Sequence, residues 1–274
     1  MIDKRRHYVL VLDTETANTL TTTIPAVLGS NGEVIKPERE AADMSNVLAY
    51  DCGWAVADTH GTIYETASFV NRDIFNDERD LMRTAYYNWK IPMYTEDLRA
   101  GRREMATTWE IRQAMLETVE QYSIKEWAAY NARFDRNALN NTQRYHTGSK
   151  YRYWFPYGSL EIWDIMKMAR DVVAPMPTFI AFCQKHGFIS GNGKPKTSAE
   201  VIYRFIIDDP SFEESHTGLE DVMIETAIMA YCFRQHKPMR KNLYDNPREW
   251  PEATEFQRQL SANLKQNPMI RVGR

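Results

Sequence analysis

The sequence has few cysteines and lacks any apolar run long enough to cross a membrane. Its three cysteines, Cys52, Cys183 and Cys232, are too few and too scattered for a disulfide framework, so we expect an intracellular, cytoplasmic protein in a reducing compartment. The apolar stretch from Tyr8 to Leu12 is too short for a signal peptide or a membrane span. We therefore expect a soluble protein with no membrane partner.

An excess of basic charge is also missing. The 274 residues carry a net charge of -3, which excludes the global positive field of many nucleic-acid-binding proteins. The charge is uneven, because residues 237–274 hold eight Lys/Arg and four Asp/Glu, a net of +4, which leaves -7 for the rest. Prolines also become frequent after His236. We interpret residues 1–236 as one domain and residues 237–274 as a basic C-terminal tail.

The most informative segment is an apolar run that ends in two carboxylates. Residues 8–15 predict a buried strand, on which Asp13 and Glu15 point to one face and Thr14 to the other. Like charges this close raise each other's pKa unless a cation lies between them. A divalent metal with oxygen ligands would supply that cation.

The rest of the chain alternates strand and helix signals, as in an α/β protein. Residues 18–46 form a polar stretch around a Ser-Asn-Gly turn and predict a hairpin-like insertion. Further strands are predicted over 47–57, 63–70 and 126–130, and helices over 78–90, 104–122, 134–144, 160–172, 179–186, 198–207, 218–236 and, in the tail, 252–264.

Two later motifs add acidic residues and a histidine. Asp135 follows a predicted strand at the start of a helix, where a lone Asp usually serves only as a helix cap. Thr217 and Glu220 have the spacing of a capping box, which places His216 on the preceding loop and Asp221 in the first turns of the helix. A metal ligand fixed on a helix (Asp221) beside a base on a loop (His216) would suit hydrolysis. The simpler interpretation is an aspartate that favours the start of a helix and an exposed loop histidine.

Taken together, these motifs resemble those of a known family. Asp13-Thr14-Glu15, Asn131-Ala132-Arg133-Phe134-Asp135 and His216-x-x-x-x-Asp221 look like the three exonuclease motifs of the DnaQ-like (DEDDh) 3'-5' exonuclease superfamily. The resemblance covers about residues 7–235. It implies a ribonuclease H-like α/β fold, with a mixed sheet of about five strands flanked by helices.

The resemblance also implies roles for the matched residues. Metal ligands for two Mg2+ ions, which Mn2+ could replace, would be Asp13, Glu15, Asp135 and Asp221. His216 would be the general base, and the substrate contacts would be Thr14, Thr16 and Asn131. Two such ions can together stabilise the attacking and leaving oxygens of a phosphodiester, and a histidine is suited to accept a proton near neutral pH.

We therefore predict an enzyme that releases nucleoside 5'-monophosphates from DNA 3' ends, in replication, repair or nucleic-acid turnover. The alternatives are an oligoribonuclease-like exoribonuclease and a non-catalytic nucleic-acid-binding subunit. DNA is favoured because the insertion and the basic tail could engage a longer strand. The expected partners are single-stranded or frayed 3' ends and, through the tail, a polymerase or another replication protein.

Two weaker patterns remain. Cys183-x-x-His186 and Cys232-x-x-x-His236 have ligand-like spacing, but they fall in apolar helices, so we favour buried cysteines over a zinc site. Eight aromatic residues lie near basic ones and could stack on bases, although we expect more than half of them to be buried. They are Tyr86, Tyr87, Trp89, Tyr94, Tyr151, Tyr153, Trp154 and Phe155. The stretch from Arg144 to Arg152 is the better candidate for nucleic-acid contact.

Overall fold

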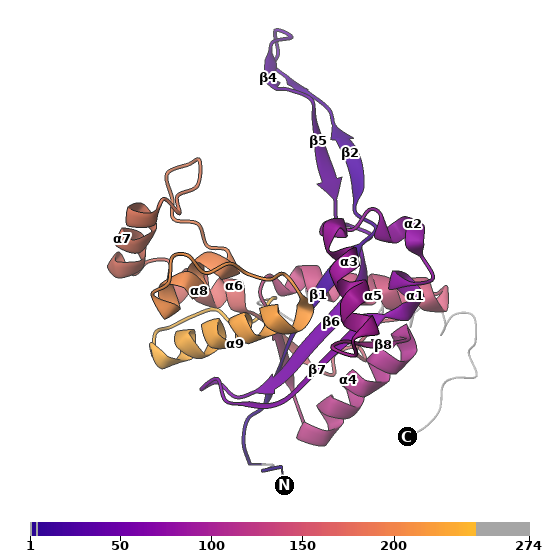
Figure 1. Ribbon diagram of the computed structural model, residues 1–274. Coiled ribbons are helices and arrows are strands. Elements are labelled where there is room, and N and C mark those ends of the chain that lie inside the picture. Colours follow the sequence, from indigo (N-terminus) through magenta and orange to yellow (C-terminus); the bar gives the residue numbers. More distant parts are fainter. Residues whose placement is uncertain (1, 4, 245–274) are drawn as a thin grey trace, which may run out of the picture.

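The computed structural model describes residues 2–3 and 5–244. Its centre is a six-stranded mixed sheet with the order β10-β9-β1-β6-β7-β8 (Figure 1). The strands are β1 (Val9–Ala17), β6 (Leu48–Ala57), β7 (Ile63–Asn71), β8 (Glu104–Ala106), β9 (Glu126–Ala129) and β10 (Glu161–Asp164). β1 runs antiparallel to β6 and parallel to β9. The predicted α/β fold with a mixed sheet flanked by helices is confirmed.

Helices cover both faces of the sheet. The helices of eight or more residues are α3 (Ile91–Arg99), α4 (Thr108–Tyr122), α5 (Ala132–Thr147), α6 (Ile165–Val172), α7 (Pro177–His186), α8 (Ala199–Ile207) and α9 (Gly218–Arg234). Val9 and Val11 of β1 face the core under α6–α9, whereas Leu10 and Leu12 face the core under α4 and α5. Because side chains alternate along a strand, Asp13 continues the α9 face and Thr14 the α5 face.

The insertion predicted at residues 18–46 is a long two-part hairpin that projects from the body (Figure 1). β2 (Leu20–Ile24) pairs with β5 (Arg39–Asp43), and beyond them β3 (Val27–Leu28) pairs with β4 (Val34–Lys36). Gly32 closes the tip with a φ of 79°, the left-handed conformation that favours glycine in a turn. The sequence pattern therefore placed this hairpin correctly.

The helix predicted over 78–90 is wrong. The chain there forms the short helices α1 (Arg72–Phe75) and α2 (Arg79–Met82), then turns and a 3-10 helix, η1 (Asn88–Lys90). Pro92 lies in the first turn of α3, the helix that follows. A proline is tolerated there because the backbone N–H groups of a first turn have no partner within the helix.

Two other predicted helices begin with a strand instead. Glu104–Ala106 is β8, and α4 begins only after Thr107, whose side chain and that of Glu110 form a reciprocal capping box. The stretch 160–172 divides in the same way into β10 and α6, with the Asp164 side chain accepting the N–H groups of Met166 and Lys167. Short apolar runs fit a strand or a helix equally well, so the sheet pairing decides between them.

The first residues beyond 236 lie against the sheet. The N–H of Leu243 donates to the carbonyl of Ile162, and Asn242 bridges to Trp163 of β10. Leu243 is itself buried. The boundary at 236 stays a prediction, and the predicted helix at 252–264 lies outside the described residues. Among those that are described, no helix is long and apolar enough to cross a membrane.

Candidate active site

Three acidic side chains meet where β1 approaches the start of α9. Ligand oxygens of Asp13, Glu15 and Asp221 lie within 4.8 Å of one another. The two β1 residues share a face, and the register of β1 against β6 shifts directly after Glu15. The predicted pairing of Asp13 with Glu15, and their meeting with Asp221, is therefore present in the structure.

Asp135 joins this group from α5. Its carboxylate is 1% exposed and accepts two hydrogen bonds from Thr14, one from the N–H (3.1 Å) and one from the hydroxyl (2.9 Å). Thr14 points to the opposite face of β1 from its neighbours, which lets it hold Asp135 beside Asp13. The hydroxyl that we predicted to contact substrate thus fixes an acidic residue. We call Asp13, Glu15, Asp135 and Asp221 the carboxylate centre.

Close packing against β6 sets the position of α9. A Cβ on Gly53 would come within 2.3 Å of the carbonyl carbon of Gly218, so the two backbones touch only because both residues are glycines. The N–H of Gly218 donates to the buried carboxylate of Asp51 (3.1 Å). Thr217 is the N-cap as predicted, but its hydroxyl donates to Glu220 and caps no backbone group. The expected capping box is therefore incomplete, and Asp51 replaces it.

His216 lies on the loop before α9, in the left-handed conformation (φ 51°). Its ring stacks on Tyr87 at 4.7 Å, and the Lys90 ammonium donates to the carbonyls of His216 (2.7 Å) and Ser215. Burial, followed by the charge of Lys90, lowers the pKa of His216. A neutral imidazole held in this way can accept a proton at neutral pH.

The negative charges of the carboxylate centre are not balanced by enough nearby positive charge, and the pKa values of its residues are raised. Burial, reinforced by the charges of Asp221 and Asp51, raises the pKa of Glu15 to about 9. Burial and the charge of Glu214 raise that of Asp221 to about 8, and burial and the charge of Asp135 raise that of Asp13. A divalent cation would reverse these shifts, because it stabilises the ionised carboxylates.

A fifth acidic residue, Glu225, was missed by the sequence analysis. It lies one turn after Asp221 on α9 and is 3% exposed, and its Oε2 has no hydrogen-bond partner among the described residues. Burial and then the charge of Asp135 raise its pKa. The i, i+4 spacing from Asp221, on an apolar helix, is the signal that could have found it.

Other predicted site residues lie nearby. Thr16 is buried just beyond the β1 irregularity, and Asn131 is an exposed left-handed residue at the start of α5. Cys183 and Cys232 are both buried in the core under α7 and α9, and His186 packs on Phe182. Neither of the two groups able to hold a metal among the described residues includes a cysteine.

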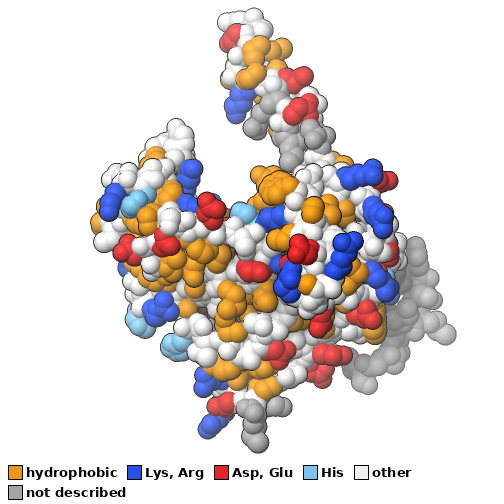
Figure 2. All heavy atoms as spheres, in the orientation of Figure 1, with side chains coloured by type: hydrophobic (Ala, Val, Ile, Leu, Met, Phe, Trp, Pro, Cys, Tyr) orange, Lys and Arg blue, Asp and Glu red, His pale blue; other side chains and the backbone are white. Residues whose placement is uncertain are grey.

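The eight aromatic residues are less buried than expected. Only Tyr94 and Trp154 are buried, so this expectation is wrong. Trp89 is 64% exposed and Tyr86 58%, and both rings contact Tyr87 edge to face. We call Tyr86, Tyr87 and Trp89 the aromatic rim, because Tyr87 joins them to His216. In Figure 2 the surface is hollowed between the lobe of α7 and α8 and the side that carries α2, α3 and the hairpin.

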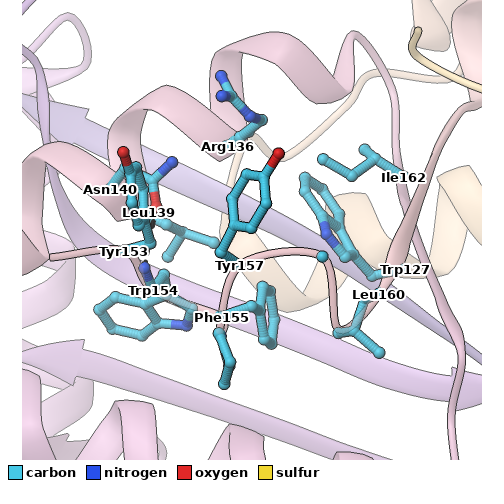
Figure 3. A pocket seen from close by; sticks show the side chains of 12 residues that line it. Trp127, Arg136, Leu139, Asn140, Tyr153, Trp154, Phe155, Tyr157, Leu160 and Ile162 are labelled. Atoms are coloured by element: carbon cyan, nitrogen blue, oxygen red, sulfur yellow. Dashed lines mark hydrogen bonds between the residues drawn. The ribbon is translucent and has the colours of Figure 1, made fainter. Parts of the chain in front are cut away.

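Several of the other rings line a separate pocket. It lies between β9, α5 and residues 153–160, and its walls include the rings of Trp127, Tyr153 and Phe155 (Figure 3). Its volume of about 50 Å³ is far below the ~300 Å³ at which ligand pockets begin. It contains no member of the carboxylate centre. Lys150, Arg152 and Tyr151 of the favoured basic stretch are exposed.

Comparison with known proteins gives structural matches only. No family model and no curated protein matches the chain. Cell-death related nuclease 4 (CRN-4) aligns over 92% of this chain and 77% of its own, with a TM-score of 0.50 and 12% identity. An exonuclease I structure aligns over 85% of this chain and 44% of its own, with a TM-score of 0.49 and 14% identity. E. coli exonuclease I in complex with a dA16 oligonucleotide aligns over 85% of this chain and 42% of its own, with a TM-score of 0.44 and 12% identity.

The chain spans less than half the length of these exonuclease I structures. At such low identity a structural match speaks for the fold alone, and the match to CRN-4 covers nearly all of this chain. This chain's own sheet is a six-stranded mixed sheet flanked by helices, as the predicted fold class requires. The chain therefore shares the fold of CRN-4, and its mixed sheet flanked by helices is consistent with the predicted ribonuclease H-like class.

Proposed function

We propose that this protein is a metal-dependent 3'-5' exonuclease that removes nucleoside 5'-monophosphates from DNA. One observation carries the proposal: acidic residues from three separate parts of the chain converge on β1, and a histidine lies beside them on the loop before α9. Capping and surface charge, the simpler reading of each motif, do not account for this convergence.

The donor set fits hard divalent cations. The carboxylate centre offers only oxygen ligands, which Mg2+ and Mn2+ prefer. Asp221 is 7% exposed, and its Oδ1 has no hydrogen-bond partner in the described part of the chain. Asp13, Glu15, Asp135 and Asp221 would hold two ions, which when bound stabilise charge on the attacking and leaving oxygens.

His216 is placed to act as the general base. The ring is partly exposed, so a water molecule can reach it, while Tyr87 and Lys90 fix the ring face and the backbone. Its lowered pKa keeps it neutral, ready to take the proton of the attacking water. Asp51 and Gly53 act indirectly, because they hold the helix start that carries Asp221.

The aromatic rim suggests how a substrate end would be held. Unpaired bases stack on exposed rings, with about 1–3 kcal/mol for each base. Trp89 and Tyr86 are exposed and lie next to the ring that touches His216. A frayed or single-stranded 3' end is therefore the proposed substrate, in replication, repair or nucleic-acid turnover. A cytoplasmic location, and a polymerase or replication partner of the tail, remain predictions.

The direct test is digestion of a 5'-labelled single-stranded oligonucleotide with Mg2+ or Mn2+. We expect a ladder that shortens from the 3' end, with nucleoside 5'-monophosphates as products. Asp13→Ala should abolish the ladder. Absence of hydrolysis with either ion, on single- or double-stranded DNA and RNA, would contradict the enzyme proposal and favour a non-catalytic nucleic-acid-binding subunit.

Matched DNA and RNA oligomers decide the polymer. We expect faster loss of DNA, because the projecting hairpin extends the surface next to the site. Equal or faster loss of RNA would favour the exoribonuclease alternative. The 2'-hydroxyl is the group that distinguishes the two substrates, so an oligomer with one 2'-hydroxyl at its 3' end sharpens the comparison.

A further inference from the structure

A second set of ligands lies on the outer side of the carboxylate centre. One atom each of Glu214, His216 and Asp221 lies within 4.8 Å of the others. Only Asp221 belongs to both sets. The proposed hydrolysis assigns His216 a role as base and leaves Glu214 without one, although the Glu214 side chain is only 11% exposed and faces the histidine.

The distance within this set fits a shared cation. His216 Nδ1 and Glu214 Oε2 are 3.5 Å apart, longer than the 2.7–3.2 Å of an ordinary N–H···O hydrogen bond. Two ligands bound at 2.0–2.1 Å to a tetrahedral zinc ion lie about 3.3 Å apart. One imidazole nitrogen with two carboxylates is a donor set that suits zinc or a similar transition metal ion better than Mg2+.

A second observation points to a ligand here. Asp221 is more than nine-tenths buried, and its Oδ1 has no hydrogen-bond partner among residues 2–3 and 5–244. An acceptor left in this state carries a desolvation cost that a bound cation removes. Because Asp221 belongs to both ligand sets, this oxygen is open to a cation in either of them.

The neighbouring charges permit a dication. Arg204 pairs with Glu200 at 3.0 Å, so these two residues largely cancel. Arg103, which acts on Lys90, is itself paired with Asp51 and Asp97, and the Lys90 ammonium donates its hydrogen bonds to backbone carbonyls of the loop. Glu214 and Asp221 contribute two negative charges against the one positive charge of Lys90. The set is also preformed, because Tyr87 and Lys90 hold the loop and α9 holds Asp221.

We propose that Glu214, His216 and Asp221 form a second cation site, selective for Zn2+ and similar transition metal ions, whose occupation inhibits the enzyme. A metal ion bound at Nδ1 uses that lone pair and leaves the ring proton on Nε2. Neither ring nitrogen can then accept a proton from water. The inhibition rests on the proposed exonuclease function, whereas the binding of the ion does not.

The test separates binding from activity. Zn2+ is titrated by calorimetry into Asp13→Asn, which weakens the carboxylate centre and leaves the second set intact, and into the same variant with Glu214→Gln. We expect the added substitution to weaken zinc affinity about tenfold or more, at least the cost of losing an outer partner of a metal ligand. Glu213→Gln, an exposed neighbour, is the matched control and should change nothing.

Two further measurements fix the ligands and the consequence. Co2+ in place of zinc should give a visible spectrum that changes in His216→Gln, which also serves if Glu214→Gln fails to fold. In the nuclease assay with excess Mg2+, micromolar Zn2+ should inhibit the wild type and inhibit Glu214→Gln much less.

Undiminished zinc affinity in both Glu214→Gln and His216→Gln, or no micromolar binding to Asp13→Asn, overturns the proposal. If zinc binds as expected but no nuclease activity exists with any metal, the site stands and the proposed function fails.

Discussion

The carboxylate centre and the aromatic rim are built in different ways. The centre lies on regular elements, β1, α5 and α9, and its residues are mostly buried in a fixed framework. The rim lies on turns and a 3-10 helix between α2 and α3, and two of its three rings are exposed. This difference suggests a division of labour, in which the framework performs the chemistry and the irregular segment positions His216 and the substrate end.

The same difference explains what the sequence could predict. Strand alternation is a local pattern, so the spacing of Asp13 and Glu15 predicts that they share a face. The helix-start signal at Thr217 likewise predicts that His216 lies on the preceding loop. The rim depends on contacts that are remote in sequence. Lys90 binds a loop more than 120 residues away, and the segment around it was taken for a helix. No local pattern encodes such a partner.

Asp51 and Glu225 show an intermediate case. Each is a buried carboxylate with mostly apolar neighbours in the sequence, which is a visible signal because burying a charge is costly. The signal does not tell what the carboxylate binds. Asp51 accepts the N–H of Gly218, whereas the charge of Asp135 acts on Glu225, and only the packing of α9 on the sheet separates the two roles.

The largest effect is expected from the framework. Asp13→Asn should lower kcat about a thousandfold, on the scale of removing one group that stabilises transition-state charge. Asp77→Asn is the matched control: Asp77 is an exposed aspartate outside the carboxylate centre, so its substitution should leave kcat unchanged. Steady-state release of mononucleotides with Mg2+ measures both variants. If Asp13→Asn kept more than a tenth of the wild-type rate, the centre would not be the reaction site.

The contact between β6 and α9 should have the next largest effect. In Gly53→Ala the new methyl group meets the backbone of Gly218, which must move and carry Asp221 with it. We expect about a hundredfold loss of kcat, typical of a misplacement of about 1 Å, and a lower melting temperature. Gly191→Ala is the control, because a Cβ at Gly191 meets nothing within 4 Å. Equal activity of the two variants would show that this contact does not position Asp221 for the reaction.

The rim should affect binding more than chemistry. Trp89→Ala should weaken single-strand binding about tenfold, as expected from one lost base stack, with little change in single-turnover rate at saturation. Trp109→Ala on α4 is the matched control, since Trp109 is similarly exposed at 59%. Fluorescence anisotropy with a labelled oligonucleotide and Ca2+ measures the affinity. A lower single-turnover rate at saturating substrate, without a loss of affinity, would show that Trp89 contributes to the chemical step and not to binding.

The smallest effect concerns the metal-free protein. Because the pKa of Glu15 is raised to about 9, the folded state holds a proton that the unfolded state loses above about 4.5. Stability without metal should therefore fall as pH rises from 7 to 9, by up to about 1.4 kcal/mol per pH unit for one proton. Urea unfolding in EDTA measures this slope. Glu15→Gln should make the slope shallower without abolishing it, because the pKa of Asp221 is also raised, to about 8; an equally steep slope in that variant would assign the effect to other groups.

The most direct test of the central claim is the number of Mn2+ ions that the chain binds, measured by electron paramagnetic resonance in the presence of a nucleoside 5'-monophosphate. We predict two ions for the wild type and fewer for Asp13→Asn. The same number in both proteins, or no bound ion at millimolar Mn2+, would contradict a two-metal site on β1 and α9.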